Sequence, residues 1–332
     1  MKAVLLERIG GEAKISDVEE PAEMNGWIKL RVLRSAICYR DLLTIKGAFP
    51  RAKTPLILGH EFVGEVVNDT LYGFSKGDRV VALPYTYCGQ CEYCLTGREN
   101  LCRSREWYGE HLDGSHAEYI LVRPESLVKI SNKIDLNYAS ISSCVVGMII
   151  NGIDSAGGIT PDMKVLVTGA SGGVGIHAIQ VAKALGAEVY AYTHSEHKVD
   201  FIEKAKPDHI IVGRNGFSRE VKELGGVDMV IETVGEPTFK ESLRSVKWGG
   251  SIVVIGNVNV KSVELPLGYI ILRQNHIHGN LSSTKKTLYK ALKLYEKGLI
   301  RAIGYEARLE DFNEIVEKME AGESLGRVFL KP

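Results

Sequence analysis

The segment Val165-Leu-Val-Thr-Gly-Ala-Ser-Gly-Gly-Val-Gly175 decides the fold of this chain. Its first residues belong to an apolar run that predicts a β-strand over 164–168, and apolar spacing over 176–185 predicts a helix. A glycine turn between a strand and a helix is typical of a dinucleotide-binding site, because backbone amides can approach a pyrophosphate at the helix N-terminus. The turn could instead serve packing alone. The candidate cofactor contacts are Gly172, Gly173, Val174 and Gly175.

Further apolar runs of strand length follow this segment. They lie at 188–192, 209–212, 228–231 and 251–255, and helix-like segments separate them. Strands that alternate with helices predict a doubly wound parallel sheet. We therefore expect a nucleotide-binding domain over 131–275.

The residues before about 130 carry mostly strand signals. Apolar runs at 27–33 and 79–83 are separated by glycines and prolines, which predicts a twisted, barrel-like β domain whose loops carry the sites. After residue 275 we expect one helix over 284–298 and a final strand over 327–330, which return to this domain. The predicted fold class is α/β, with a β-barrel domain (1–130, completed by 276–332) in addition to the parallel-sheet domain.

Composition excludes several functions. The chain has 332 residues, enough for two domains, and 45% of them are hydrophobic, as in ordinary globular proteins. Its 41 basic and 41 acidic residues give a formal net charge of zero, so we expect no nucleic-acid partner. No run of 18 apolar residues predicts a membrane span, and residues 1–8 are typical of a strand rather than a signal peptide. We expect a cytoplasmic protein with no membrane partner, whose cysteines are metal ligands or catalytic groups rather than disulfides.

Four of the six cysteines form one run with the spacing C-x2-C-x2-C-x7-C. Zinc binds four thiolates in a tetrahedron, and two-residue gaps let successive thiolates converge on one ion from a tight loop. We predict a structural zinc lobe at about 85–105; the alternative is a redox pair or a set of reduced thiols. The predicted ligands are Cys88, Cys91, Cys94 and Cys102.

The other two cysteines, Cys38 and Cys144, lie far apart, and a Gly59-His60-Glu61 triplet stands between them. We expect Cys144 on a helix over 140–151. Two thiols and one imidazole suit a zinc ion with one position left open for substrate. Simpler interpretations exist: a lone cysteine is often a small buried hydrophobe, and a lone histidine can be a hydrogen-bonded core residue. The residues alone leave both interpretations open.

The end of the strand at 188–192 bears on the choice of cofactor. A fold that binds NAD usually has Asp or Glu there, which binds the ribose hydroxyls. This chain has Tyr-Thr-His-Ser-Glu-His-Lys over 192–198, with no acid at the strand end. Thr193, Ser195 and Lys198 would accept a 2′-phosphate, which predicts NADPH. The alternative is a solvated loop, and Glu196 argues against a phosphate.

These residues together resemble the zinc-containing medium-chain dehydrogenase/reductase family over nearly the whole chain. The resemblance implies a GroES-like first domain, a Rossmann nucleotide domain, and two zinc ions per chain, one structural and one catalytic. Relatives form dimers or tetramers, so a homotetramer or homodimer is expected. The markers are Gly59-His60-Glu61-x-x-Gly64, Gly77-Asp78-Arg79-Val80, the four-cysteine lobe, Asp113-Gly114-x-x-Ala117-Glu118-Tyr119 and Gly172-Gly173-Val174-Gly175.

The resemblance also implies roles for particular residues. Cys38, His60 and Cys144 become expected ligands of the catalytic zinc, with Glu61 as a fourth or alternating ligand. Asp41 matches the carboxylate that orients the histidine ligand. Further candidate cofactor contacts are Val234, Gly235 and Gly256.

One departure from the family pattern concerns the reaction. Zinc alcohol dehydrogenases usually have Ser or Thr two residues after the first cysteine ligand, as a proton relay, and here Arg40 takes that place. Tyr39-Arg40-Asp41 is similar to the quinone and enoyl reductase branch, which commonly lacks this zinc. A tyrosine common in related enoyl-thioester reductases is Phe49 here, so the proton donor would be Tyr39, a zinc-bound water or solvent.

A closer resemblance is to archaeal acryloyl-CoA reductases. Its markers are Cys38-Tyr-Arg-Asp-Leu42, the run 169–186 and Leu267-Gly-Tyr-Ile-Ile-Leu272. It implies NADPH-dependent reduction of a short acyl-CoA thioester, acryloyl-CoA to propanoyl-CoA. Tyr39, Arg40, Cys38 and His60 are then the candidate catalytic residues, and Arg40 or Lys285-Lys286 could meet CoA phosphates. The alternatives are a zinc alcohol dehydrogenase for primary or secondary alcohols or aldehydes, and a non-catalytic relative that binds the cofactor.

Overall fold

The computed structural model describes residues 1–213 and 216–332, and the chain divides into two compact units. The first comprises Met1–Gly147, Ser282–Glu296 and Gly304–Pro332, and the second comprises Met148–Leu281 and Lys297–Ile303. We predicted the changes of domain near residues 130 and 275. Residues 131–147 belong to the first unit. The domain boundaries that we gave remain a prediction.

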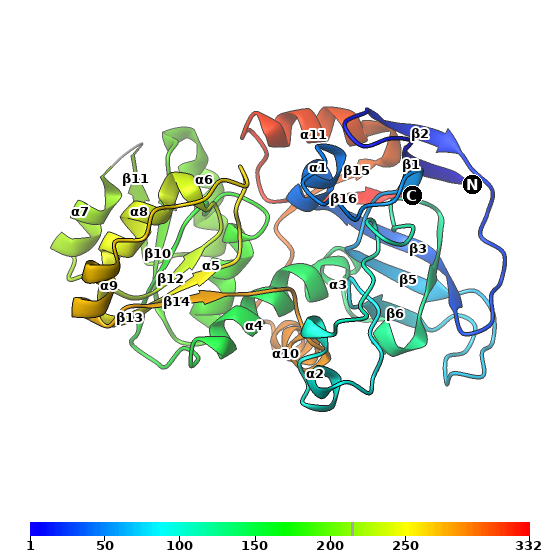
Figure 1. Ribbon diagram of the computed structural model, residues 1–332, viewed down its shortest axis with the longest axis horizontal. Helices are drawn as coiled ribbons and strands as arrows, with labels where there is room; N and C mark the ends of the chain where they lie inside the picture. The colour runs from blue at the N-terminus through cyan, green and yellow to red at the C-terminus, as the bar shows by residue number, and fades with distance from the viewer. Residues whose placement is uncertain (214–215) are drawn as a thin grey trace. The chain divides into compact units, whose positions relative to one another are not determined.

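The second unit contains a six-stranded parallel sheet (Figure 1), with the order β11-β10-β9-β12-β13-β14. This order reverses direction beside β9, as in doubly wound nucleotide-binding folds. The central strands are continuous apolar runs because helices cover both faces of a parallel sheet. The strands are β9 (Lys164–Val167), β10 (Glu188–Thr193), β11 (His209–Val212), β12 (Val227–Glu232), β13 (Val246–Val254) and β14 (His276–Gly279). The helices are α4 (Met148–Ser155), α5 (Gly175–Ala184), α6 (Val199–Ile202), α7 (Phe217–Glu223), α8 (Glu236–Ser245) and α9 (Leu267–Arg273).

The first unit is built on the long strand β3 (Ile28–Ile37), which pairs antiparallel with β5, β7 and β16. A separate small sheet has the order β2-β1-β4. The other strands are β1 (Lys2–Leu6), β2 (Ala13–Asp17), β4 (Leu56–Ile57), β5 (Phe62–Val66), β6 (Arg79–Ala82), β7 (Tyr119–Val122), β8 (Leu127–Lys129), β15 (Gly304–Arg308) and β16 (Arg327–Lys331). The helices are α1 (Tyr39–Ile45), α2 (Glu92–Leu95), α3 (Leu136–Ile141), α10 (Lys285–Glu296) and α11 (Phe312–Glu320).

The tail after residue 275 holds more structure than the single helix and strand that we predicted. In addition to α10 and β16, it forms β14, which belongs to the parallel sheet, β15, which pairs parallel with β16, and the helix α11. Phe312 and Ile315 of α11 are buried, and Val316 and Met319 pack against the same core. These four residues have the spacing of an amphipathic helix, so α11 is a helix that the sequence indicates and that we did not predict.

The helical run Leu136–Ser155 contains an irregular turn that the sequence did not predict. Residues Ser142–Gly147 form a π-helix between α3 and α4, where we expected a regular helix over 140–151. Turns of this kind often occur at functional sites, and this one carries Cys144. By length and composition alone the run could cross a membrane, although we predicted no such span. However, 72% of it is buried, as in a core helix.

Candidate active site

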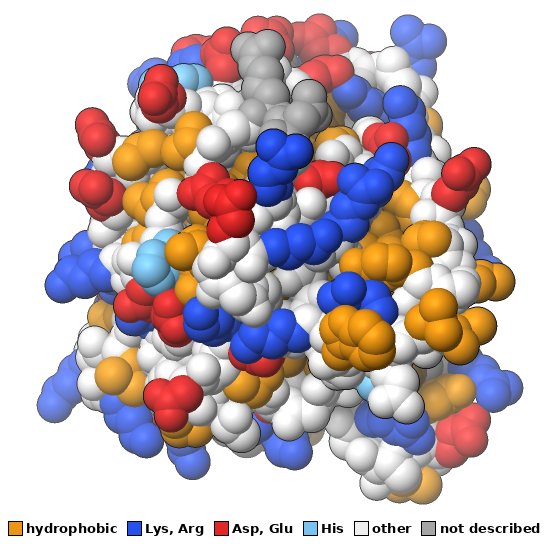
Figure 2. Space-filling view, turned by 90° about the vertical axis from the view of Figure 1, so that its left-hand side faces the viewer, with side chains coloured by type: hydrophobic (Ala, Val, Ile, Leu, Met, Phe, Trp, Pro, Cys, Tyr) orange, Lys and Arg blue, Asp and Glu red, His pale blue; other side chains and the backbone are white. Residues whose placement is uncertain are grey.

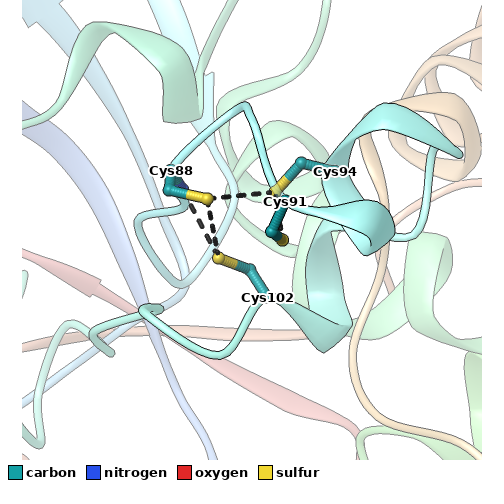
Figure 3. A group of neighbouring side chains, drawn as sticks. All are labelled: Cys88, Cys91, Cys94 and Cys102. Carbon is teal, nitrogen blue, oxygen red and sulfur yellow. Dashed lines mark hydrogen bonds between the residues drawn. The ribbon is translucent and has the colours of Figure 1, made fainter.

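The four cysteines of the predicted lobe lie together in the first unit (Figure 3). Their Sγ atoms are 3.9 Å apart for Cys88 and Cys94, 3.5 Å for Cys91 and Cys94, and 3.6 Å for Cys102 and Cys88. A tetrahedral zinc with bonds of about 2.3 Å has sulfur–sulfur edges of about 3.8 Å. The spacing of the four thiols therefore fits a zinc ion.

Local backbone amides and burial give these thiols unequal acidities. The amides of Gln90 and Cys91 lower the pKa of Cys88 to about 6, whereas burial raises the pKa of Cys94 to about 12. Protons must leave such thiols before a metal binds them, because the thiolate is the ligand form. A divalent cation would thus replace the thiol protons and hold the four sulfurs together.

The lobe is tied to the first turn of α10. Glu99, which is buried, accepts a hydrogen bond of 2.5 Å from the backbone amide of Lys285. The hydroxyl of Tyr85 donates to the carbonyl of Ser283 at 2.7 Å. The Ser283 hydroxyl lies 2.9 Å from that of Ser143 in the π-helix. Side chains of the lobe region therefore fix the segment that packs beside Cys144.

Cys38, His60, Glu61 and Cys144 form a second cluster, whose ligand atoms all lie within 4.8 Å of one another. Cys38 caps the N-terminus of α1, and His60 and Glu61 come directly before β5. His60 and Glu61 are buried, whereas Cys38 and Cys144 are partly exposed as residues. Two thiols and one imidazole suit a metal site with an open position.

The ring of His60 has one nitrogen held and one nitrogen available. Its Nδ1 lies 3.3 Å from a carboxylate oxygen of Asp41, as the family resemblance implied. Its Nε2 is buried and has no hydrogen-bond partner among the described residues. A buried polar atom without a partner is costly, and a metal ion would remove that cost. The donor set therefore fits a zinc ion.

Glu61 is held by a partner that the sequence did not predict. Arg327 of β16 forms two hydrogen bonds to its carboxylate, and both side chains are almost fully buried. Burial acts to raise the pKa of Glu61, and the paired arginine opposes this shift. Glu61 lies 3.8 Å from Nε2 of His60 through one oxygen, so it is near the metal position but committed to Arg327.

Tyr39 and Arg40 open helix α1, directly after Cys38. The guanidinium of Arg40 pairs with Glu110 and lies over the rings of Trp107, at 4.3 Å, and Phe49, at 5.1 Å. An acid and two aromatic faces thus already occupy the guanidinium that we expected to meet a CoA phosphate. Of that predicted set, Lys285 is partly buried beside Glu99, and Lys286 is exposed.

The predicted cofactor residues lie at the carboxyl ends of β9, β10, β12 and β13 of the second unit or in the segments that follow them. The glycine turn packs tightly, because a Cβ on Gly175 would lie 2.2 Å from the carbonyl oxygen of Gly169. Glu232, which we did not predict, is buried and accepts hydrogen bonds from the amides of Val234 and Gly235 at 2.9 Å. The loops therefore present backbone at the carboxyl edge of the sheet, where such folds bind a dinucleotide.

The residues predicted for the 2′-phosphate lie at the end of β10. Thr193 is buried there, and its hydroxyl accepts a hydrogen bond of 3.3 Å from the amide of Ser195. Lys198 is buried as well, while Glu196 is exposed. The remaining predicted contacts, Gly172, Gly173, Val174 and Gly256, belong to the loops after β9 and β13.

Comparison with known proteins agrees with this description. Residues 24–132 match the family model of the alcohol dehydrogenase GroES-like domain, and residues 173–297 match that of zinc-binding dehydrogenases. The acryloyl-coenzyme A reductase of Sulfurisphaera tokodaii is 46% identical, with 100% of both chains covered. That of Metallosphaera sedula is 43% identical, with 99% of each covered. The solved alcohol dehydrogenase from the archaeon Aeropyrum pernix has a TM-score of 0.92 at 26% identity, with 100% of both chains covered.

The GroES-like unit, the parallel sheet and the two cysteine clusters define a zinc-binding dehydrogenase. This chain belongs to the zinc-containing medium-chain dehydrogenase/reductase family, and it is an oxidoreductase that acts on a small molecule. The predicted fold class and the family resemblance are thereby confirmed. The roles of individual site residues remain predictions.

Proposed function

We propose that this protein reduces the carbon–carbon double bond of a short enoyl thioester with NADPH, converting acryloyl-CoA to propanoyl-CoA. The observation that carries the proposal is the 46% identity, over the whole chain, with the acryloyl-coenzyme A reductase of Sulfurisphaera tokodaii. The site adds support, because Arg40 stands where zinc alcohol dehydrogenases have a relay hydroxyl, and Glu110 and Trp107 hold it there.

The reaction adds a hydride to the β-carbon and a proton to the α-carbon of the acryloyl group. Negative charge develops on the thioester oxygen, so a positioned Lewis acid or hydrogen-bond donor would lower the barrier. Tyr39 is our candidate proton donor: it adjoins Cys38, and its side chain is partly exposed. Phe49, packed on Arg40, offers no hydroxyl.

We propose two zinc ions per chain, one in the four-cysteine lobe and one at Cys38, His60 and Cys144. When bound, the second ion supplies a Lewis acid for the thioester oxygen. The protein's own part is to hold the ligands: Asp41 keeps the His60 ring in place, and Arg327 balances the charge of Glu61. Its hydrogen bonds to Arg327 hold the Glu61 carboxylate beside the metal position.

We propose NADPH as the cofactor, which supplies the hydride when bound. The glycine turn would take the pyrophosphate at the N-terminus of α5. No acid ends β10, and Thr193 and Ser195 offer hydroxyls there. Binding of NADPH at least tenfold tighter than NADH would agree with this assignment, and equal binding would contradict it.

The deciding test is oxidation of NADPH with acryloyl-CoA, run beside a panel of alcohols and aldehydes. We expect turnover with acryloyl-CoA and formation of propanoyl-CoA. Activity confined to alcohols and aldehydes would reject the thioester assignment. Metal analysis of the same sample should give two zinc ions per chain.

A zinc alcohol dehydrogenase is the second candidate. The complete ligand cluster and the likeness to the Aeropyrum pernix alcohol dehydrogenase favour it. The variant Cys38→Ala separates the two candidates, because it should abolish alcohol oxidation, whereas an enoyl reductase would retain part of its rate. Cofactor binding without turnover on any substrate would instead indicate a non-catalytic relative.

We further propose a cytoplasmic homotetramer or homodimer. Strand β14 is an open edge of the parallel sheet, and exposed apolar side chains lie on α9 nearby in sequence. Figure 2 shows groups of hydrophobic side chains among charged ones at the left-hand end of Figure 1, where α9 lies. Unpaired strand edges and apolar patches are common at subunit interfaces. Light scattering coupled to size exclusion would give the mass, and a monomer would contradict the proposal. The exposed side chains are Leu267, Ile271 and Leu272.

A further inference from the structure

A chain of buried polar side chains ends on the ring of His60. The hydroxyls of Ser115 and Ser35 are 2.7 Å apart, and Ser35 Oγ lies 2.8 Å from Nδ1 of His116. Nε2 of His116 lies 3.3 Å from one oxygen of Asp41, whose other oxygen is 3.3 Å from Nδ1 of His60. Every member is at most 2% exposed. Asp41 therefore has a second imidazole, that of His116, on the side away from His60.

The carboxylate of Asp41 determines which atoms carry the protons in this series of hydrogen-bonded side chains. Asp41 accepts a hydrogen bond of 2.8 Å from the amide of Cys38 and lies against two imidazoles. An ionised carboxylate only accepts hydrogen bonds, so Nε2 of His116 carries a proton toward it. Nδ1 can then accept the proton of the Ser35 hydroxyl.

The ring of His116 is itself held firmly. Its backbone amide donates to the carbonyl of Leu58 at 2.8 Å, and its ring lies 5.4 Å from that of Phe312. It also packs against Gly59, where an added Cβ would lie 2.6 Å from Nδ1. Gly59 has φ +100° and directly precedes His60. A rigid ring at this place can fix its hydrogen-bond partner.

We propose that His116 is a positioning residue of the metal site: it fixes Asp41, which in turn fixes the ring of His60. The inference rests on the metal site of the proposed function, but not on the substrate. Partners behind a metal ligand keep it oriented, and their loss typically lowers metal affinity by about 10- to 100-fold. His116 is one step further from the metal than the residues usually assigned this role.

Three variants test the proposal, and Asp41→Ala serves as the reference for loss of the carboxylate. His116→Phe keeps a ring beside Phe312 but removes both hydrogen bonds, whereas His116→Gln supplies an amide donor for Asp41. Ser35→Ala removes the hydroxyl that contacts Ser115 and Nδ1 of His116, and leaves the contact between His116 and Asp41 in place. Zinc affinity would be measured by competition with a chelator, and site geometry by the visible spectrum after cobalt substitution. The four-cysteine lobe serves as the internal reference.

We expect His116→Phe to lower zinc affinity at the second site by about 10- to 100-fold and to change its cobalt spectrum. His116→Gln should recover most of the affinity, and Ser35→Ala should stay near the parent protein. Wild-type affinity and spectrum in His116→Phe, or equal losses in both His116 variants, would overturn the proposal. If His116→Phe does not fold, a loss in His116→Gln as large as in Asp41→Ala would overturn it. A parent protein with zinc only in the lobe would reject the metal site itself, before any substitution.

Discussion

The two cysteine clusters of the first unit are assembled in different ways. The lobe takes all four ligands from residues 88–102, and backbone turns bring their sulfurs together. The second cluster takes Cys38, His60 and Cys144 from distant segments. Buried Asp41 holds His60, and buried Arg327 holds Glu61. A local site depends on its loop, whereas a dispersed site depends on the whole unit. Substitutions should therefore have different costs in the two regions.

The largest difference is expected from the buried ion pair of the second cluster. Arg327→Leu leaves the carboxylate of Glu61 buried without its partner, which should destabilise the metal-free protein by about 3–5 kcal/mol. Urea unfolding would measure the loss. The double variant Glu61→Leu/Arg327→Leu should recover much of it, because no unpaired charge remains.

The matched control is the exposed pair Arg103–Glu92 of the lobe. Arg103→Leu should leave the urea midpoint unchanged, because solvent screens an exposed ion pair. Equal effects of Arg327→Leu and Arg103→Leu would show that buried charge does not distinguish the two regions.

A smaller effect should come from the connection between the lobe and α10. Glu99→Ala removes the acceptor of the Lys285 amide, and leaving a buried donor unsatisfied costs about 1–3 kcal/mol. Glu99→Gln retains a carbonyl oxygen at the same place and should preserve most of the stability. Thermal unfolding of both variants would show the difference. If the two variants lose equal stability, the hydrogen bond does not tie the lobe to the helix.

The smallest effect concerns rates within the lobe and needs no substitution. In zinc-free protein, Cys88 should react with iodoacetamide well before Cys94, because its pKa is lowered to about 6 while that of Cys94 is raised to about 12. The rate at Cys88 should fall as the pH drops below about 6, where its thiolate becomes protonated. Peptide mapping by mass spectrometry would follow both residues. Similar rates at pH 7 would contradict this assignment of acidities.

The parts of the structure that depend on neighbouring residues could be predicted. Apolar runs located five of the six strands of the parallel sheet, all except β14, and cysteine spacing located the lobe, because each signal lies within a few residues. The residues alone left the second cluster open beside simpler interpretations, and the family resemblance was needed to favour it, since Cys38 and Cys144 lie more than a hundred residues apart.

Contacts between distant residues escaped prediction. Arg327 lies 266 residues after Glu61, and nothing in its local sequence indicates a buried partner. His116 stands within a family motif, but only the folded chain brings it to Asp41. Arg40 looked free from sequence because its acidic partner, Glu110, lies 70 residues away. The π-helix that carries Cys144 was not predicted either. It packs against α10, which comes much later in the sequence.

The pairing of Arg327 with Glu61 also has a consequence for synthesis on the ribosome. At about 5–20 residues per second, the 266 residues between them take roughly 13–53 seconds to make. Throughout that interval Glu61 has no arginine to neutralise it, so burying its carboxylate is unfavourable. The nascent first unit should therefore keep this region open, and its interior should close only after β16 has left the exit tunnel.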